Sequence, residues 1–218
     1  SEMCIRDRYD IFDRVNRGGT PLNKQEMRNA LYRGRCTRML DKLCCSPEFL
    51  IATGRSINKE RMKDQYVVLR AIAFLMLHRG EFKDIPALQY RGDIDDFLAR
   101  FMVYVNDNAP EKLIVDYENL FIRCMQISYD LLGENGFRFS GNGIRRPINM
   151  PLFEALSYLF SFVPEKIDYT WASRLILDIE SVKEEFDDSR YFSGNIDSTT
   201  SVSFRFDRMD KIINRIQL

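Results

Sequence analysis

Apolar residues recur along most of the chain at the spacing of three and four that marks an amphipathic helix. Residues 59–78 are apolar on nearly every face in their second half, which predicts the buried central helix of a domain. No internal repeat and no alternating strand pattern of useful length is visible. The sequence therefore predicts a mainly α protein, an irregular multi-helix domain with short connections. Further helices are predicted over TRMLDKLCC, DIDDFLARFMVYVND, EKLIVDYENLFIRCMQISYDLLG, PLFEALSYLFSFV, DYTWASRLILDIESVKEEF and VSFRFDRMDKIINRIQL.

Two of the predicted helices are preceded by capping residues. Asn23 is the expected N-cap of the first, and Glu26, three residues later, completes a capping box. Asn58 is the expected cap of the central helix. Gly18 and Gly19 come just before the first helix and allow two interpretations. They form either a plain turn or a turn whose backbone N–H groups face an anion, and the residue types favour the plain turn.

Charge and cysteine usage narrow the class of protein. Lys and Arg number 32, as do Asp and Glu, so no global charge draws the chain to nucleic acid or to an anionic membrane. The five cysteines form no Cys-x-x-Cys pair, which indicates reduced thiols and a cytoplasmic location. The longest nearly apolar run, residues 66–77, is too short to span a bilayer, so no membrane partner is expected. Arg70 interrupts that run, and a structural ion pair is its expected role.

The residue types also exclude several kinds of catalysis. His78 is the one histidine, which argues against a histidine-dependent metal nuclease and leaves poor ligands for zinc, so no metal site is expected. Neither a P-loop nor a Gly-x-Ser-x-Gly elbow occurs. We expect His78 to interact with the dipole at the C-terminal end of the central helix.

The segment GENGFRFSGNGIRRPINM breaks the helical pattern with four glycines and a proline, and is predicted to be a loop. Its aromatic and arginine side chains could stack on bases and hold phosphates. Exposed loops also carry such residues without any function. A second basic patch occurs in LYRGRCTR, with Arg33, Arg35 and Arg38. The nucleic-acid-binding candidates are Arg138, Arg145 and Arg146, with DNA as the candidate partner.

The first residues do not look like protein sequence. Met3 to Arg8 read MCIRDR, which is what one frame of a common transposon-based sequencing adapter encodes. We therefore expect residues 1–8 to be an adapter artefact and the genuine chain to continue upstream of Tyr9. The alternative is a real N-terminus that happens to match.

One run of residues resembles a known family. FDRVNRGGTPLNKQEMRNALYRG, residues 12–34, is similar to the end of the N-terminal domain of GmrSD-type restriction endonucleases, a ParB/sulfiredoxin-like nucleotide-handling domain. Members of that family show the run Phe-x-x-hydrophobic-Asn-x-x-Gly-x-x-Leu-x-x-x-Glu. Later segments, such as RMKDQYVVLRAIAF and DRMDKIINRI, resemble the helical region that follows this domain in many members, but the similarity is weaker there. The run falls here on Phe12, Val15, Asn16, Gly19, Leu22 and Glu26.

The resemblance implies a division of the chain. Residues 9–34 would be the truncated end of a ParB-like α/β domain, residues 35–190 a helical domain, and residues 191–218 a polar connection with a C-terminal helix. The nucleotide motif of the family, Asp-Gly-Gln-Gln-Arg, is missing, so the fragment is expected to be inactive. The parent protein would use a nucleoside triphosphate with Mg²⁺, and we expect no cofactor in this chain. Remnants of the nucleotide site would be Arg14, Asn16, Gly18 and Gly19.

The resemblance thus predicts a fragment of a prokaryotic, nucleotide-hydrolysing, DNA-targeting phage-defence protein of the restriction type. Two alternatives are of a different class. A helical module could bind a protein partner or a second copy of itself through an exposed apolar groove. A DNA-binding module would show salt-dependent binding through the three loop arginines.

Overall fold

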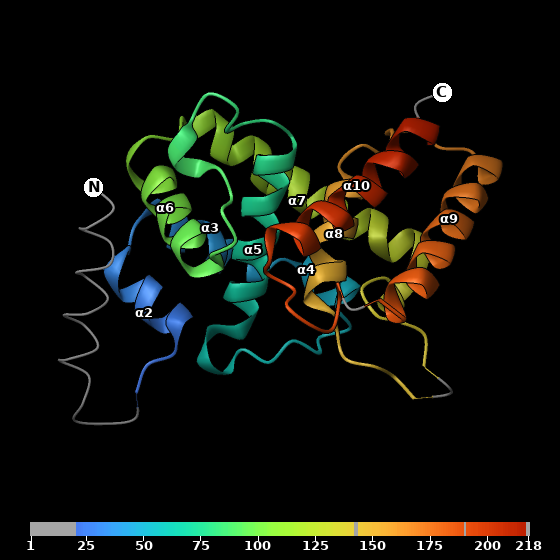
Figure 1. Cartoon of the computed structure of the whole chain (residues 1–218), viewed down its shortest axis with the longest axis horizontal. Helices are drawn as coiled ribbons and strands as arrows, with labels where there is room; N and C mark the ends of the chain where they lie inside the picture. The colour runs from blue at the N-terminus through green and yellow to red at the C-terminus, as the bar shows by residue number, and fades with distance from the viewer. Residues whose placement is uncertain (1–20, 142–143, 190, 217–218) are drawn as a thin grey trace.

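The computed structural model describes residues 21–141, 144–189 and 191–216. Within these ranges the chain is mainly helical and has no strand, which confirms the predicted fold class (Figure 1). Short 3₁₀ turns lie at η2 (Glu60–Met62), η3 (Pro86–Leu88) and η4 (Gly133–Asn135). The α-helices are α2 (Lys24–Leu31), α3 (Arg35–Cys44), α4 (Pro47–Ala52), α5 (Lys63–His78), α6 (Ile94–Asp107), α7 (Glu111–Leu132), α8 (Met150–Phe160), α9 (Tyr169–Asp187) and α10 (Thr199–Ile216).

The capping box predicted for the first helix is present. The Asn23 side chain accepts hydrogen bonds from the backbone N–H groups of Gln25 and Glu26, at 2.8 and 2.9 Å. In return the Glu26 carboxylate accepts from the backbone N–H of Asn23 at 2.6 Å. These bonds satisfy donors that a helix start otherwise leaves unpaired, so α2 begins where the sequence predicts.

The predicted start of the central helix is wrong. Helix α5 begins at Lys63, because Arg61 and Met62 adopt left-handed backbone angles, with φ of 56° and 57°. Asn58 instead accepts a hydrogen bond from the backbone N–H of Glu60 at 2.9 Å. The side chain therefore stabilises the turn before the helix rather than the helix itself.

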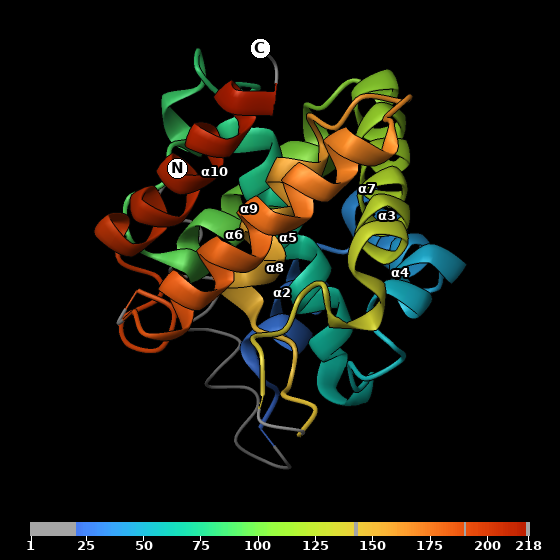
Figure 2. The same cartoon turned by 90° about the vertical axis from the view of Figure 1, so that its right-hand side faces the viewer.

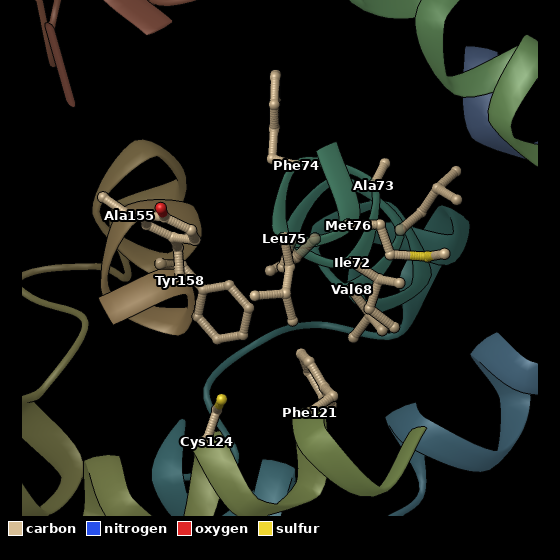
Figure 3. Packing of buried hydrophobic residues seen from close by; sticks show 14 of the residues in the cluster. Val68, Ile72, Ala73, Phe74, Leu75, Met76, Phe121, Cys124, Ala155 and Tyr158 are labelled. Atoms are coloured by element: carbon tan, nitrogen blue, oxygen red, sulfur yellow. The ribbon is translucent and has the colours of Figure 1, made fainter. Parts of the chain in front are cut away.

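Helix α5 is the buried centre of the fold, as its apolar sequence predicts. Its side chains from Val67 to Met76 are all buried, and α3, α6, α7 and α8 pack around it. Figure 3 shows Phe121 of α7 pointing toward Val68, and Tyr158 of α8 beside Leu75. Because α5 has neighbours on every side, it needs no polar face.

Helices α2 and α10 belong to the same packed body as the rest of the described chain. Arg28 of α2 is fully buried, binds Asp95 of α6 at 2.8 Å, and lies over the ring of Tyr66 on α5. Helix α10 packs along α8, and one hydrophobic cluster runs from Tyr32 to Ile213. The cluster therefore includes described residues from both sides of positions 34 and 190, and the predicted division of the chain stays a prediction.

Arg70 has the structural ion pair that the sequence predicts. Its Nε donates to Glu154 Oε1 at 2.5 Å, and its Nη2 donates to Asp197 Oδ1 at 2.6 Å. Arg205 of α10 donates to the other oxygen of Glu154 at 2.9 Å. The two arginines and Glu154 are buried, so this network joins α5, α8 and α10 in the interior of the protein.

His78 does not take the role predicted for it. Its ring stacks on Phe206 with the ring centroids 3.6 Å apart. Burial, helped by the nearby charge of Arg205, lowers the pKa of His78 to about 3. A neutral imidazole gains nothing from the negative end of a helix dipole, so His78 acts as a packing residue.

Candidate anion-binding site

The glycine-rich loop between α7 and α8 lies next to the connection between α4 and α5. Both segments extend below the helices at the same end of the molecule (Figures 1 and 2). The loop begins at Gly133, whose φ of 59° ends α7, and reaches Asn149, which caps α8 through the backbone N–H of Leu152. Helix caps at both ends therefore set where the described part of the loop sits.

A hollow of about 710 Å³ opens beside this loop, and we call it the loop pocket. It is the place where the described part of the loop meets the buried side of α9. Its walls are formed by Leu132, Glu134, Asn135, Arg138, Phe139, Ser140, Gly141, Ile144, Arg145, Arg146, Glu180 and Lys183.

Arg138 lies in the loop pocket wall, but the structure does not place it as an exposed phosphate ligand. It is buried, and its guanidinium donates to the backbone carbonyls of Glu134 and Thr53, both at 3.1 Å. It also donates to the carbonyl of Arg146 and to the hydroxyl of Ser56. Arg138 therefore ties the loop to the α4–α5 connection, and its contact with nucleic acid stays a prediction.

The two aromatic residues of the loop are buried as well. Phe137 packs on Phe153 with the ring centroids 4.3 Å apart, and Phe139 packs edge-on against Phe192. Neither ring presents a free face for a nucleic-acid base, contrary to the base-stacking prediction. Their apolar area is taken up by the core instead.

Arg145 and Arg146 are the predicted candidates that reach the surface. Their side chains are 47% and 40% exposed. Arg145 pairs with Glu134 at 2.8 Å, and Arg146 pairs with Asp187 while lying over the ring of Phe139. Both guanidinium groups can therefore be reached from solvent, but each already has a carboxylate partner.

Lys183 is a cation of the loop pocket that the sequence reasoning missed. It lies on the buried side of α9, and its ammonium donates to Glu180 at 2.9 Å and to the carbonyl of Asn135 at 3.3 Å. The signal in the sequence was a lysine inside the apolar stripe of an amphipathic helix.

The charges that line the loop pocket have an excess of positive sign. Arg138, Arg145, Arg146 and Lys183 line it together with Glu134 and Glu180, and Asp187 pairs with Arg146 from outside the lining, so four cations meet three carboxylates. A pocket of this kind attracts anions, and planar guanidinium groups suit phosphate oxygens.

Gly54 allows the ion pair of Arg145 to sit where it does. A Cβ atom at this position would overlap Nη2 of Arg145 and lie 2.7 Å from Oε2 of Glu134. Its φ of 58° is also one that glycine adopts without strain. The backbone of the α4–α5 connection therefore approaches the pocket closely because this residue has no side chain.

The other predicted site residues form two groups. Arg14, Asn16, Gly18 and Gly19 fall outside the described residues. In the second basic patch Arg33 and Arg38 are exposed, while Arg35 of α3 donates to the carbonyl of Asn106 and faces Glu111. Arg35 thus belongs to the contact of α3 with α6 and α7, and none of the three arginines lines the loop pocket.

The described residues do not supply a metal centre. In those ranges no group of three or more His, Cys, Asp or Glu side chains could hold a metal ion. Cys36, Cys44, Cys45 and Cys124 are free, and burial raises the pKa of Cys124 to about 12, which keeps that thiol protonated.

Across residues 21–216, apart from the gaps, every helix is too short or too polar to cross a membrane.

Fold and site together define a helical domain with a cationic surface pocket. Comparison of the chain with protein-family models, with curated proteins and with solved structures gives no match.

Proposed function

We propose that this chain is part of a GmrSD-type, nucleotide-hydrolysing, DNA-targeting defence protein, and that its helical domain contacts nucleic acid through the loop pocket. The observation that carries the nucleic-acid contact is the convergence of Arg145, Arg146 and Lys183 on one hollow. The similarity of residues 12–34 to the family run carries the parentage. Nucleotide hydrolysis would belong to the Asp-Gly-Gln-Gln-Arg motif of the parent, which this sequence lacks.

The ion pairs of the loop pocket suggest how a phosphodiester would bind. An incoming phosphate would compete with Glu134 for Arg145 and with Asp187 for Arg146. Exposed ion pairs contribute only about 0–1 kcal/mol each, so they exchange easily. Binding of this kind releases counterions from the nucleic acid and therefore weakens steeply as salt rises.

Fluorescence anisotropy with labelled DNA, at several salt concentrations, tests the nucleic-acid contact. The double variant Arg145→Ala/Arg146→Ala should bind more weakly, with a salt slope reduced by about one for each lost phosphate contact. Arg174→Ala is the matched control, because Arg174 is exposed on α9 and does not line the loop pocket. Equal affinity of the double variant and the wild type would count against a phosphate contact here.

The parentage has a separate test in the source DNA. An open reading frame that continues upstream of Tyr9 into an Asp-Gly-Gln-Gln-Arg motif would support the GmrSD-type parent. A stop codon followed by a genuine start before Ser1 would contradict it, and the helical module would then stand alone.

A helical protein-interaction module is the second candidate. Exposed large apolar side chains favour this candidate: Ile144, Tyr169 and Leu177 are 77%, 88% and 71% exposed. Sedimentation velocity of the wild type and of Tyr169→Ser/Leu177→Ser tests self-association. A wild type that stays monomeric at high concentration would argue against a homo-oligomer through Tyr169 and Leu177.

A further inference from the structure

A second hollow, of about 340 Å³, is lined in part by residues of the α4–α5 connection, and we call it the Asp64 pocket. Thr53 lines it, while the carbonyl of Thr53 binds Arg138 of the loop pocket. The next residue, Gly54, lies against Arg145. Thr53 and Gly54 therefore connect the two pockets, because each contacts an arginine of the loop pocket wall. The Asp64 pocket is lined by Cys44, Phe49, Leu50, Thr53, Arg55, Ile57, Asn58, Lys59 and Asp64.

Asp64 is a buried carboxylate with few partners. The residue is only 7% exposed, and its Oδ1 accepts one hydrogen bond, from the backbone N–H of Gln65 at 2.8 Å. Among the described residues no Lys, Arg or His nitrogen lies within 4.0 Å of it. Burial raises the pKa of Asp64, and the hydrogen bond from Gln65 and the charge of Lys59 only partly oppose this. A carboxylate can accept about four hydrogen bonds, so this one has room for donors from a ligand.

The remaining walls separate into an apolar interior and a basic mouth. Phe49 is buried and, with Leu50 and Ile57, gives the pocket apolar sides. Burial also raises the pKa of the Cys44 thiol, which stays protonated and adds no second negative charge beside Asp64. Arg55 and Lys59 are exposed at the rim. The arrangement suits a flat apolar ligand with N–H donors at its inner end and an anionic group at its outer end.

Among nucleobases, guanine has the edge that matches this carboxylate. Its N1–H and 2-amino group are adjacent donors that can meet two carboxylate oxygens side by side. Uracil and thymine flank their one N–H with carbonyl oxygens, which a carboxylate repels. Adenine and cytosine place an acceptor nitrogen next to the amino group. This edge is accessible only when the base is unpaired.

We propose that the Asp64 pocket receives an unpaired guanine of a single-stranded nucleic acid, whose backbone passes Arg55 toward Arg145 and Arg146. The inference rests on the proposed nucleic-acid contact of the loop pocket and adds a base preference to it. Arg55 and Lys59 would meet the phosphates next to the bound base, while the loop pocket would hold phosphates further along the strand.

The test is the affinity of the whole chain for a set of labelled oligothymidines with one central substitution. The wild type should bind the strand with dG at least about five-fold more tightly than the strand with dT, dA or dC, the low end of what a bidentate base contact is worth. Deoxyinosine lacks the 2-amino group, and its strand should fall between dG and dT. Asp64→Asn should lose the dG preference, whereas Asp116→Asn, at an exposed carboxylate on α7, should keep it.

The outcomes separate this inference from the function on which it rests. Equal binding of all strands by the wild type, weakened by Arg145→Ala/Arg146→Ala, would overturn the guanine pocket and leave the phosphate contact standing. An absence of binding to any strand would overturn both. The deoxyinosine comparison uses only the wild type, so it decides the question even if Asp64→Asn fails to fold.

Discussion

Glu154 accepts a hydrogen bond from Arg70 at 2.5 Å in the interior between α5 and α8. Its second oxygen accepts from Arg205 of α10, at 2.9 Å. One buried carboxylate thus compensates two buried guanidinium groups from different helices, with Asp197 as a second anion for Arg70. Such a network specifies which helices meet, because a displaced helix would leave a charge buried without its partner.

Replacing that carboxylate should be costly. Glu154→Gln keeps the size of the side chain but leaves Arg70 and Arg205 without its charge, so we expect a loss of about 3–5 kcal/mol in the free energy of unfolding. Urea denaturation followed by circular dichroism measures it. Glu184→Gln, at an exposed position of α9, should stay within about 0.5 kcal/mol of the wild type. Similar midpoints for the two variants would contradict a stabilising role for the network.

The pH dependence of stability should carry a contribution from His78. Its pKa is lowered from 6.5 to about 3 in the folded protein, mainly by burial. Below about pH 6.5 the unfolded chain therefore binds a proton that the folded protein does not bind. The free energy of unfolding should fall as the pH decreases, by about 1.4 kcal/mol per pH unit once the unfolded histidine is protonated.

His78→Phe isolates this contribution, because it keeps an aromatic ring against Phe206 and removes the titrating group. Urea denaturation of both proteins between neutral pH and pH 5 should show the variant losing less stability than the wild type. The chain has one histidine, so no second imidazole can mask the difference. Parallel curves for the two proteins would show that the folded state protonates His78 normally.

The capping box of α2 can be tested by a change at one residue. Asn23→Ala removes the acceptor for the N–H groups of Gln25 and Glu26 and should lower the free energy of unfolding by about 1 kcal/mol. Asn23→Asp keeps an acceptor at the same place but loses the Nδ2 donor to the carbonyl of Arg61, so its loss should be smaller than that of Ala. Thermal unfolding of the three proteins gives the comparison, and equal losses for Ala and Asp would mean that the cap does not matter.

A side chain at position 54 should lower both the stability of the protein and its DNA binding at the loop pocket. In Gly54→Ala the new methyl group strains a left-handed residue and displaces Arg145, so we expect weaker DNA binding together with a loss of about 1 kcal/mol or more. Gly80→Ala has the same kind of backbone strain, at φ of 84°, with no atom within 4 Å of the added Cβ. It should lose stability but bind DNA as the wild type does. Equal binding by both variants would argue against Arg145 as a contact.

Local features of this protein follow from its sequence. Asn23, Glu26 and the long apolar stripes fix a helical fold through interactions between residues that are near neighbours in the chain. The need of Arg70 for a buried partner could also be foreseen, because an unpaired charge in an apolar helix is too costly. The sequence could not tell which residue would be the partner of Arg70.

Only the tertiary structure decided the long-range relationships. Glu154 and Asp197 come together at Arg70 from positions far apart in the chain, and the burial of Arg138 depends on carbonyls of the α4–α5 connection. The loop arginines look alike in the sequence, but the fold buries Arg138 and leaves Arg145 and Arg146 within reach of solvent. Burial and charge pairing depend on which helices pack together, and that is a property of the whole chain rather than of any local pattern.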